Sequence, residues 1–184
     1  SKLDENKKAI SIFENLLNLN NNNEEILSNL ANEYQKIDNY TKSADMLERL
    51  LLLNKYNEIN WYSYIITCEI SKNSKRSLYF IKNFIKSKPY DHEAWFYLGI
   101  LGILYQRMDN HLEAIESFDY SICIKEDYIT AYTNKAESLS ELGYYQKAID
   151  CCKETFKYED PEAILYFDIG EMYEKMDDLN KAKS

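Results

Sequence analysis

The sequence contains few residues that interrupt a helix: 4 glycines and 2 prolines among 184 residues. A β-sandwich or β-barrel needs a turn about every 8–12 residues, so this composition argues against both. No apolar run approaches the roughly 18 residues that a membrane-spanning helix requires, and the opening segment, SKLDENKK, does not resemble a signal peptide. Apolar residues nevertheless make up 45% of the chain, which is too many for a disordered protein.

The patterns typical of enzymes and metal sites are also missing. The sequence has no glycine-rich phosphate loop, no H-E-x-x-H motif and no nucleophile elbow. The cysteines do not follow a metal-binding spacing; they are Cys68, Cys123, Cys151 and Cys152. We interpret them as reduced thiols of a cytoplasmic protein. We therefore expect that the protein is not an enzyme and that it uses no metal and no cofactor.

The apolar residues that are present follow a helical period. Ile10, Phe13 and Leu17 illustrate a spacing that places side chains on one face of a helix. No long stretch alternates with a period of two, as a half-buried strand would. The predicted fold class is therefore all-α.

The helical pattern repeats along the chain. A small residue follows each polar turn, at Ala9, Ser43, Ser77, Ala114, Ala148 and Ala182. Successive positions are separated by 34, 34, 37, 34 and 34 residues, and each interval holds helix, turn and helix. A period of this length is typical of solenoids in which helix pairs stack on one another.

The units resemble the tetratricopeptide repeat, a helix pair with W-x-x-L-G-x-x-Y in its first helix and A-x-x-x-F in its second. The best matches are WFYLG at 95–99, YFDIGEMY at 166–173 and LSNLANEY at 27–34. The resemblance covers essentially the whole chain. It implies a right-handed superhelical solenoid of antiparallel helix pairs.

One unit departs from the repeat pattern. Trp61 matches the motif, and Pro89 stands at its late proline position. However, Tyr64, Ile65 and Cys68 replace the leucine, glycine and tyrosine of the first helix. This unit is the weakest match to the family.

The register predicts four full repeats between two partial ones. The full repeats span 24–57, 58–91, 92–128 and 129–162. Residues 1–23 hold the second helix of a preceding repeat, near 6–19, and residues 163–184 begin another repeat. Because solenoids normally end in polar capping repeats, we interpret 1–184 as a single array that is a fragment of a longer one; the alternative is an array whose ends are disordered.

One repeat carries three extra residues. The tripeptide Gly-Ile-Leu occurs twice in succession, at 99–101 and 102–104. Gly99 fits the motif when counted from the preceding repeat, and Gly102 fits it when counted back from Ala114. Three residues turn a helix by about 300° and lengthen it by about 4.5 Å. We predict a continuous first helix close to one turn longer than its siblings; the alternative is a local bulge.

The resemblance also implies where a partner binds. Tetratricopeptide arrays bind proteins or extended peptides in a concave groove lined by the first helices. The groove positions of the family fall here on the aromatic residues Tyr62, Phe96, Tyr97 and Phe167 and on the polar residues Asn134, Glu137, Glu141, Asp168 and Glu171. Two alternatives remain: the aromatic side chains pack against neighbouring repeats, and the acids are ordinary solvated helix surface.

The charge of the groove predicts the kind of partner. Residues 129–184 hold 12 acidic and 7 basic side chains, within a chain of net charge −9. An acidic groove favours a basic segment and speeds its encounter. The same charge argues against nucleic acid, and the lack of apolar runs argues against a membrane.

One subclass of the family clamps a C-terminal carboxylate with lysine, asparagine and arginine. The lysine position of that clamp holds other residues here: Ser28, Tyr62, Phe96, Thr133 and Phe167. We therefore expect no binding of acidic C-terminal peptides.

The predicted function is a non-catalytic scaffold that binds a peptide or protein segment in the groove. The alternative is a structural spacer, or a scaffold that self-associates through its uncapped ends. In that alternative the N-terminal helix exposes Ile10, Phe13 and Leu17 for pairing with another copy.

Overall fold

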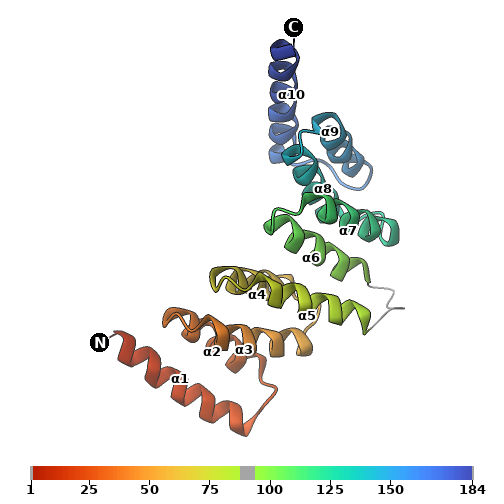
Figure 1. Cartoon of the computed structure of the whole chain (residues 1–184). Coiled ribbons are helices and arrows are strands. Elements are labelled where there is room, and N and C mark those ends of the chain that lie inside the picture. Colours follow the sequence, from red (N-terminus) through yellow and green to blue (C-terminus); the bar gives the residue numbers. More distant parts are fainter. Residues whose placement is uncertain (1, 88–93, 184) are drawn as a thin grey trace. The chain divides into compact units, whose positions relative to one another are not determined.

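The computed structural model describes residues 2–87 and 94–183, with side chains described as far as Asp177. Within these residues every regular element is a helix, so the predicted all-α fold class is confirmed (Figure 1). By its internal contacts the chain forms two compact units, residues 1–80 and residues 81–184. The boundary between the units falls inside one helix, α5.

The N-terminal unit is built from helices joined by short turns. They are α1 (Lys2–Leu19), α2 (Glu24–Lys36), α3 (Tyr40–Leu53), α4 (Glu58–Ile70) and the first half of α5 (Ser74–Lys86). α1 packs against α2, α2 against α3, and α3 against α4. Their apolar faces form a core whose largest side chains are Leu27, Leu30, Leu50, Leu51, Trp61 and Tyr64.

The C-terminal unit continues in the same way. Its elements after α5 are α6 (Ala94–Arg107), α7 (His111–Ile124), α8 (Ile129–Glu141), α9 (Tyr145–Glu154), a short 3₁₀ helix η1 (Thr155–Lys157) and α10 (Ala163–Lys183). Consecutive α-helices from α6 to α10 contact each other, and α6 also contacts α8. The fully buried side chains include Tyr97, Ile100, Leu104, Phe118 and Ile149.

In the repeat division proposed from the sequence, the first helices are α2, α4, α6, α8 and α10, and the second helices are α1, α3, α5, α7 and α9. The division itself stays a proposal. Pro89, at the late proline position, lies outside the described residues.

The turn between a first helix and the following second helix uses one backbone motif. A residue with positive φ recurs in it, at Asp38 (59°), Lys72 (57°), Asp109 (61°) and Gly143 (77°). In the turn at Asp38, the N–H of Asn39 donates to the carbonyl of Tyr34 across 2.8 Å, and the equivalent bond closes the other three turns. This is the Schellman closure, in which glycine alone adopts positive φ without steric cost.

The polar turn expected ahead of Ala182 is not formed, so this detail of the repeat pattern was wrong. α10 continues without interruption to Lys183. Asp177, the position equivalent to Gly143, lies within this helix.

The N-terminal helix buries part of the face that the sequence analysis expected to be exposed. Ile10 and Leu17 are buried, because α2 packs against this side of α1, and Phe13 is half-buried. The exposed apolar side chains of α1 are instead Leu3, Ile12, Leu16 and Leu19.

Both copies of Gly-Ile-Leu lie within the continuous α-helix α6. The described part of α6 has 14 residues, against 13 in each of α2, α4 and α8. The residues just before Ala94 lie outside the described part, so the predicted lengthening stays a prediction.

The two glycines of the duplication have different neighbours. A Cβ on Gly102 would lie 2.5 Å from a ring carbon of Phe118 on α7, and a Cβ on Gly99 would lie 2.8 Å from a ring carbon of Tyr128 ahead of α8. Both distances are too short for a real side chain. Each glycine therefore allows close packing at a different helix contact.

Charged residues recur where a second helix packs against the following first helix; we call these contacts seams. At the seam of α1 and α2, the hydroxyl of Tyr34 donates to the carboxylate of Glu14. The ammonium of Lys42 lies 5.0 Å from the centre of the Tyr34 ring. The acid, the ring and the cation thus connect three consecutive helices.

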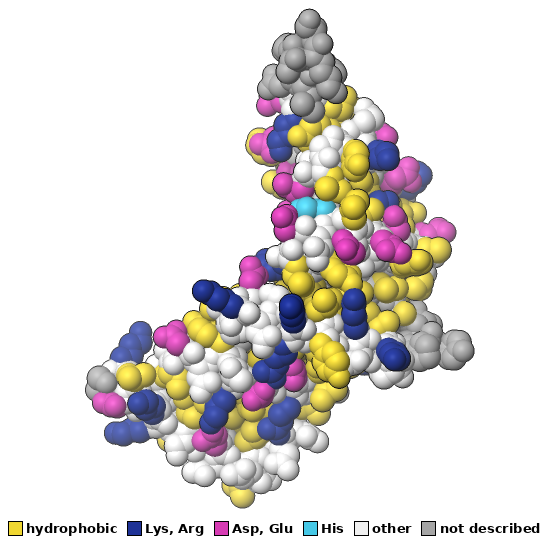
Figure 2. Space-filling view, viewed as in Figure 1, with side chains coloured by type: hydrophobic (Ala, Val, Ile, Leu, Met, Phe, Trp, Pro, Cys, Tyr) yellow, Lys and Arg dark blue, Asp and Glu magenta, His cyan; other side chains and the backbone are white. Residues whose placement is uncertain are grey.

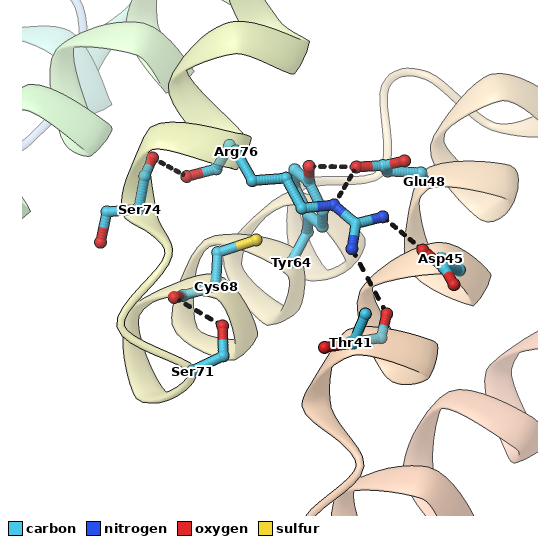
Figure 3. Close-up of polar contacts among 9 residues, drawn as sticks. Thr41, Asp45, Glu48, Tyr64, Cys68, Ser71, Ser74 and Arg76 are labelled. Carbon is cyan, nitrogen blue, oxygen red and sulfur yellow. Dashed lines mark hydrogen bonds and ion pairs between the residues drawn. The ribbon is translucent and has the colours of Figure 1, made fainter.

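The seam of α3 and α4 is the most extensive polar cluster in the N-terminal unit (Figure 3). The guanidinium of Arg76 donates to Glu48 across 2.8 Å, to Asp45 across 2.5 Å and to the carbonyl of Thr41 across 3.4 Å. The hydroxyl of Tyr64 also donates to Glu48. Arg76 is one helix further along the chain than Tyr64, so this cluster ties α3, α4 and α5 together.

Candidate functional site

A cavity of about 350 Å³ lies between α8 and α10, with α9 beneath it. Four carboxylates belong to its lining: Glu137, Glu141, Asp168 and Glu171. The apolar part of the lining consists of Ala136, Cys152, Leu165 and Met172. We call this site the acidic cavity.

Helical spacing explains why these carboxylates converge. Glu137 and Glu141 are one turn apart on α8, and Asp168 and Glu171 are one turn apart on α10. Because α8 and α10 both pack against α9, the two pairs face a common space. Asn134 completes the α8 side of the lining.

The carboxylates differ in how they are held. The side-chain amide of Gln106 on α6 donates to Glu137 across 2.8 Å, which fixes the position of that carboxylate. Glu141, Asp168 and Glu171 form no hydrogen bond or ion pair with any residue that the structure describes. Lys175 is the lysine of the lining, and it too forms no ion pair within the described part of the chain. The lining therefore holds four carboxylates and one lysine, without an ion pair among the described residues.

Cys152 lies at the buried side of the acidic cavity. Burial, together with the nearby negative charge of Asp168, raises the pKa of its thiol to about 11. Burial likewise raises the pKa of Cys151 to about 12. Both thiols are therefore protonated and weakly nucleophilic at neutral pH. All four cysteines are free.

The structure brings five of the nine predicted groove residues together: Asn134, Glu137, Glu141, Asp168 and Glu171 all line the acidic cavity. The predicted aromatic floor is not among them. Phe96 and Tyr97 are 3% and 1% exposed, and Tyr97 packs against Phe84 with ring centres 4.8 Å apart. For these two side chains the structure favours the alternative of packing between helices.

The other two predicted aromatic residues lie elsewhere. Phe167 is on α10 and 61% exposed, but it does not line the acidic cavity. Tyr62 is half-buried on α4, in the N-terminal unit. The sequence analysis missed the actual apolar lining, Leu165 and Met172; their spacing of seven residues is a helical signal that could have indicated it.

Charge is distributed unequally between the two units. Residues 1–80 carry 10 basic and 11 acidic side chains, a net charge of −1, whereas residues 81–184 carry 12 and 20, a net charge of −8. Acidic side chains lie over several elements of the C-terminal unit on the face shown in Figure 2. The acidic cavity therefore belongs to the strongly negative unit.

The described residues contain neither a candidate metal centre nor a candidate membrane span. No group of three or more histidine, cysteine, aspartate or glutamate side chains is placed there to hold a metal ion. None of the helices described is long and apolar enough to cross a membrane.

Comparison with known proteins supports the repeat family. Residues 129–159, which hold α8 and α9, match the family model of the tetratricopeptide repeat. No curated protein matches the sequence.

Solved structures extend the likeness over most of the chain. The chain resembles PilW, a widely conserved type IV pilus biogenesis factor, with a TM-score of 0.64 and 14% identity over 94% of this chain and 79% of that one. It resembles YrrB, a TPR protein with an unusual peptide-binding site, with a TM-score of 0.56 and 17% identity over 93% and 86% of the two chains. It resembles MamA with a TM-score of 0.53 and 21% identity over 81% and 85%.

At these identities the solved structures show the fold alone. That fold is an all-α solenoid of helix pairs, and one of the pairs matches the repeat model itself. Together these findings show an all-α solenoid in which residues 129–159 match the tetratricopeptide repeat model. Solenoids of stacked helix pairs form extended surfaces suited to contacts with other proteins.

Proposed function

We propose that this chain is a non-catalytic scaffold and that its acidic cavity receives a basic segment of a partner protein. The observation that carries the proposal is the convergence of Glu137, Glu141, Asp168 and Glu171 on one cavity. Three of these carboxylates have no partner among the described residues, so a ligand cation would not have to displace one.

The apolar part of the lining matches the chemistry of such a ligand. Lysine and arginine have long aliphatic stems that pack on apolar surface while the charged group stays among polar partners. Leu165 and Met172 provide apolar surface next to the carboxylates. YrrB, one of the similar structures, is described as having a peptide-binding site, and we extend peptide binding to this chain as part of the proposal.

Binding of a basic segment can be tested with a displayed peptide library selected against the purified chain. Lysine and arginine should be enriched in the selected peptides. One selected peptide is then titrated by fluorescence anisotropy against Glu141→Gln/Glu171→Gln, which should weaken binding about tenfold. Moderate salt should weaken binding to the wild-type chain as well.

The matched control removes the same charge from outside the acidic cavity. Glu116→Gln/Glu126→Gln alters two exposed carboxylates of the same unit that do not line it, so the affinity should change little. The proposal is wrong if the library shows no preference for basic residues, or if the control pair weakens binding as much as the cavity pair. A peptide with an acidic C-terminus should not bind.

The spacer alternative makes a different prediction. If the chain acts only as a structural spacer or self-associating scaffold, no peptide is selected and the mass in solution rises with concentration. Burial of Ile10 and Leu17 removes two of the apolar side chains on which self-association through α1 was based.

A further inference from the structure

Tyrosines fill the seams of this chain at recurring positions. In the N-terminal unit Tyr34 contacts Glu14 and Lys42, and Tyr64 contacts Glu48. Tyr34 lies nine residues before the small residue Ser43.

Two seams of the C-terminal unit also hold a tyrosine in contact with a charged side chain. The ammonium of Lys82 lies 5.2 Å from the centre of the Tyr105 ring, and Lys153 donates to the hydroxyl of Tyr173 across 3.0 Å. Tyr105 and Tyr173 also lie nine residues before a small residue, Ala114 and Ala182. A phenol ring in contact with a charged side chain thus recurs in the seams of this chain.

The seam of α7 and α8 is different. Leu139 holds the position of Tyr34, Tyr105 and Tyr173, and Lys135 holds the position of Tyr64. The ammonium of Lys135 pairs with Asp119 across 2.5 Å. A cavity of about 430 Å³ lies at this seam. We call it the seam cavity.

The lining of the seam cavity has both an apolar and a charged part. Ile115, Tyr132 and Leu139 supply apolar surface. Asp119, Lys135, Lys147, Asp150 and Glu154 supply charges of both signs, the types that surround Tyr34 in its own seam. None of the residues that line the acidic cavity lines the seam cavity.

We propose that the seam cavity is a docking site for a tyrosine side chain of a partner protein. The ring of the incoming tyrosine packs on Ile115 and Leu139. Its hydroxyl donates to Asp119 or accepts from Lys147, as the hydroxyl of Tyr34 donates to Glu14 and accepts from Lys42. A phenylalanine lacks the hydroxyl and cannot form this hydrogen bond, so the site favours tyrosine.

The test uses p-cresol, the side-chain analogue of tyrosine, and toluene, which lacks the hydroxyl. Both are titrated into the full chain while the methyl NMR signals of Ile115 and Leu139 are followed. We expect saturable shifts at these methyl groups with a dissociation constant on the order of 1 mM for p-cresol. Toluene should bind about fivefold more weakly.

Two substitutions separate docking from nonspecific contact. Leu139→Tyr supplies the ring from the chain itself, so p-cresol binding should be lost while circular dichroism shows a folded protein. Leu112→Tyr adds a tyrosine at an exposed position of α7 outside the seam cavity and should leave binding unchanged. Asp119→Asn/Lys147→Met should bring the affinities for p-cresol and toluene together.

Several results would overturn the proposal. Shifts that do not saturate, or that spread over the whole surface, would show that p-cresol has no site here. Equal binding of p-cresol and toluene to the wild-type chain would by itself show that the site does not recognise the hydroxyl. If p-cresol binds a folded Leu139→Tyr protein as well as it binds the wild-type chain, its ring does not occupy the seam cavity. The acidic cavity is unaffected by any of these outcomes.

Discussion

The small residue of each second helix is alanine or serine, and the serine hydroxyls differ in whether they form a hydrogen bond. The hydroxyl of Ser43 is buried without a hydrogen-bond partner among the residues described, whereas the hydroxyl of Ser77 donates to the carbonyl of Ser74 across 2.8 Å. A buried hydroxyl without a partner costs free energy. Ser43→Ala should therefore raise the free energy of unfolding by about 1 kcal/mol, measured by urea denaturation. Ser77→Ala, the matched control, should be neutral or destabilising; a loss of stability in both variants would contradict the prediction.

The glycines also have different roles at the residue scale. Gly102→Ala should lower the free energy of unfolding by about 1–3 kcal/mol, because its Cβ would overlap the Phe118 ring. Gly170 has no atom within 4 Å of where its Cβ would lie, so Gly170→Ala should raise stability by up to about 1 kcal/mol through helix propensity. Thermal denaturation of both variants measures the difference. Two shifts of the same sign would refute this interpretation.

At the scale of elements, the turns offer a test of backbone strain. Lys72 has a φ of 57° and an exposed side chain, while Gly143 fills the equivalent position without strain. Lys72→Gly should therefore stabilise the chain by about 1 kcal/mol, and Gly143→Ala should destabilise it by a similar amount. Chemical denaturation of the two variants checks both signs. A destabilised Lys72→Gly protein would mean that the flexibility of glycine in the unfolded chain outweighs the relief of strain.

The helices also show which parts of the fold and of the candidate site could be predicted from the sequence. The all-α fold was predictable because apolar spacing is a local property of each helix. Asp168 and Glu171 were predicted from the groove positions of the resembled family, and both line the acidic cavity. Burial of Tyr97 was not predictable from its own helix, because its ring packs against Phe84 from another helix. The continuation of α10 was missed because the repeat pattern implies a turn before Ala182, whereas α10 continues through these residues.

At the scale of the whole molecule, buried tyrosine hydroxyls and cysteine thiols with raised pKa values make the stability of the fold sensitive to high pH. Burial raises the pKa of Tyr34, Tyr64 and Cys68 in the N-terminal unit. It raises the pKa of Cys152 to about 11 in the C-terminal unit. The folded chain therefore keeps protons that the unfolded chain has already lost. This contribution is fully present below pH 9.0, the ordinary thiol pKa, and is lost as pH rises through the folded values.

The midpoint of thermal unfolding should therefore fall steadily between pH 9 and pH 11, measured by circular dichroism with a reductant present. Each buried thiol contributes roughly 1–2 kcal/mol over this range. Cys151→Ala/Cys152→Ala should flatten the fall, whereas Cys123→Ala, which alters an exposed thiol, should leave it unchanged. A constant midpoint up to pH 11 would disprove the linkage.

The seams have a consequence for how the chain avoids misfolding. Helix pairs of similar shape can dock one repeat too far along, which is a characteristic error of repeat proteins. Glu48 meets Arg76 in its own seam, but after a skipped repeat it would meet Glu113, the equivalent residue of the next second helix. Lys82, similarly displaced, would meet Lys135 and Lys147. The order of charges along the chain thus favours pairing of each helix with its correct neighbour, where opposite charges meet. It disfavours a skipped repeat during folding, because like charges would then meet.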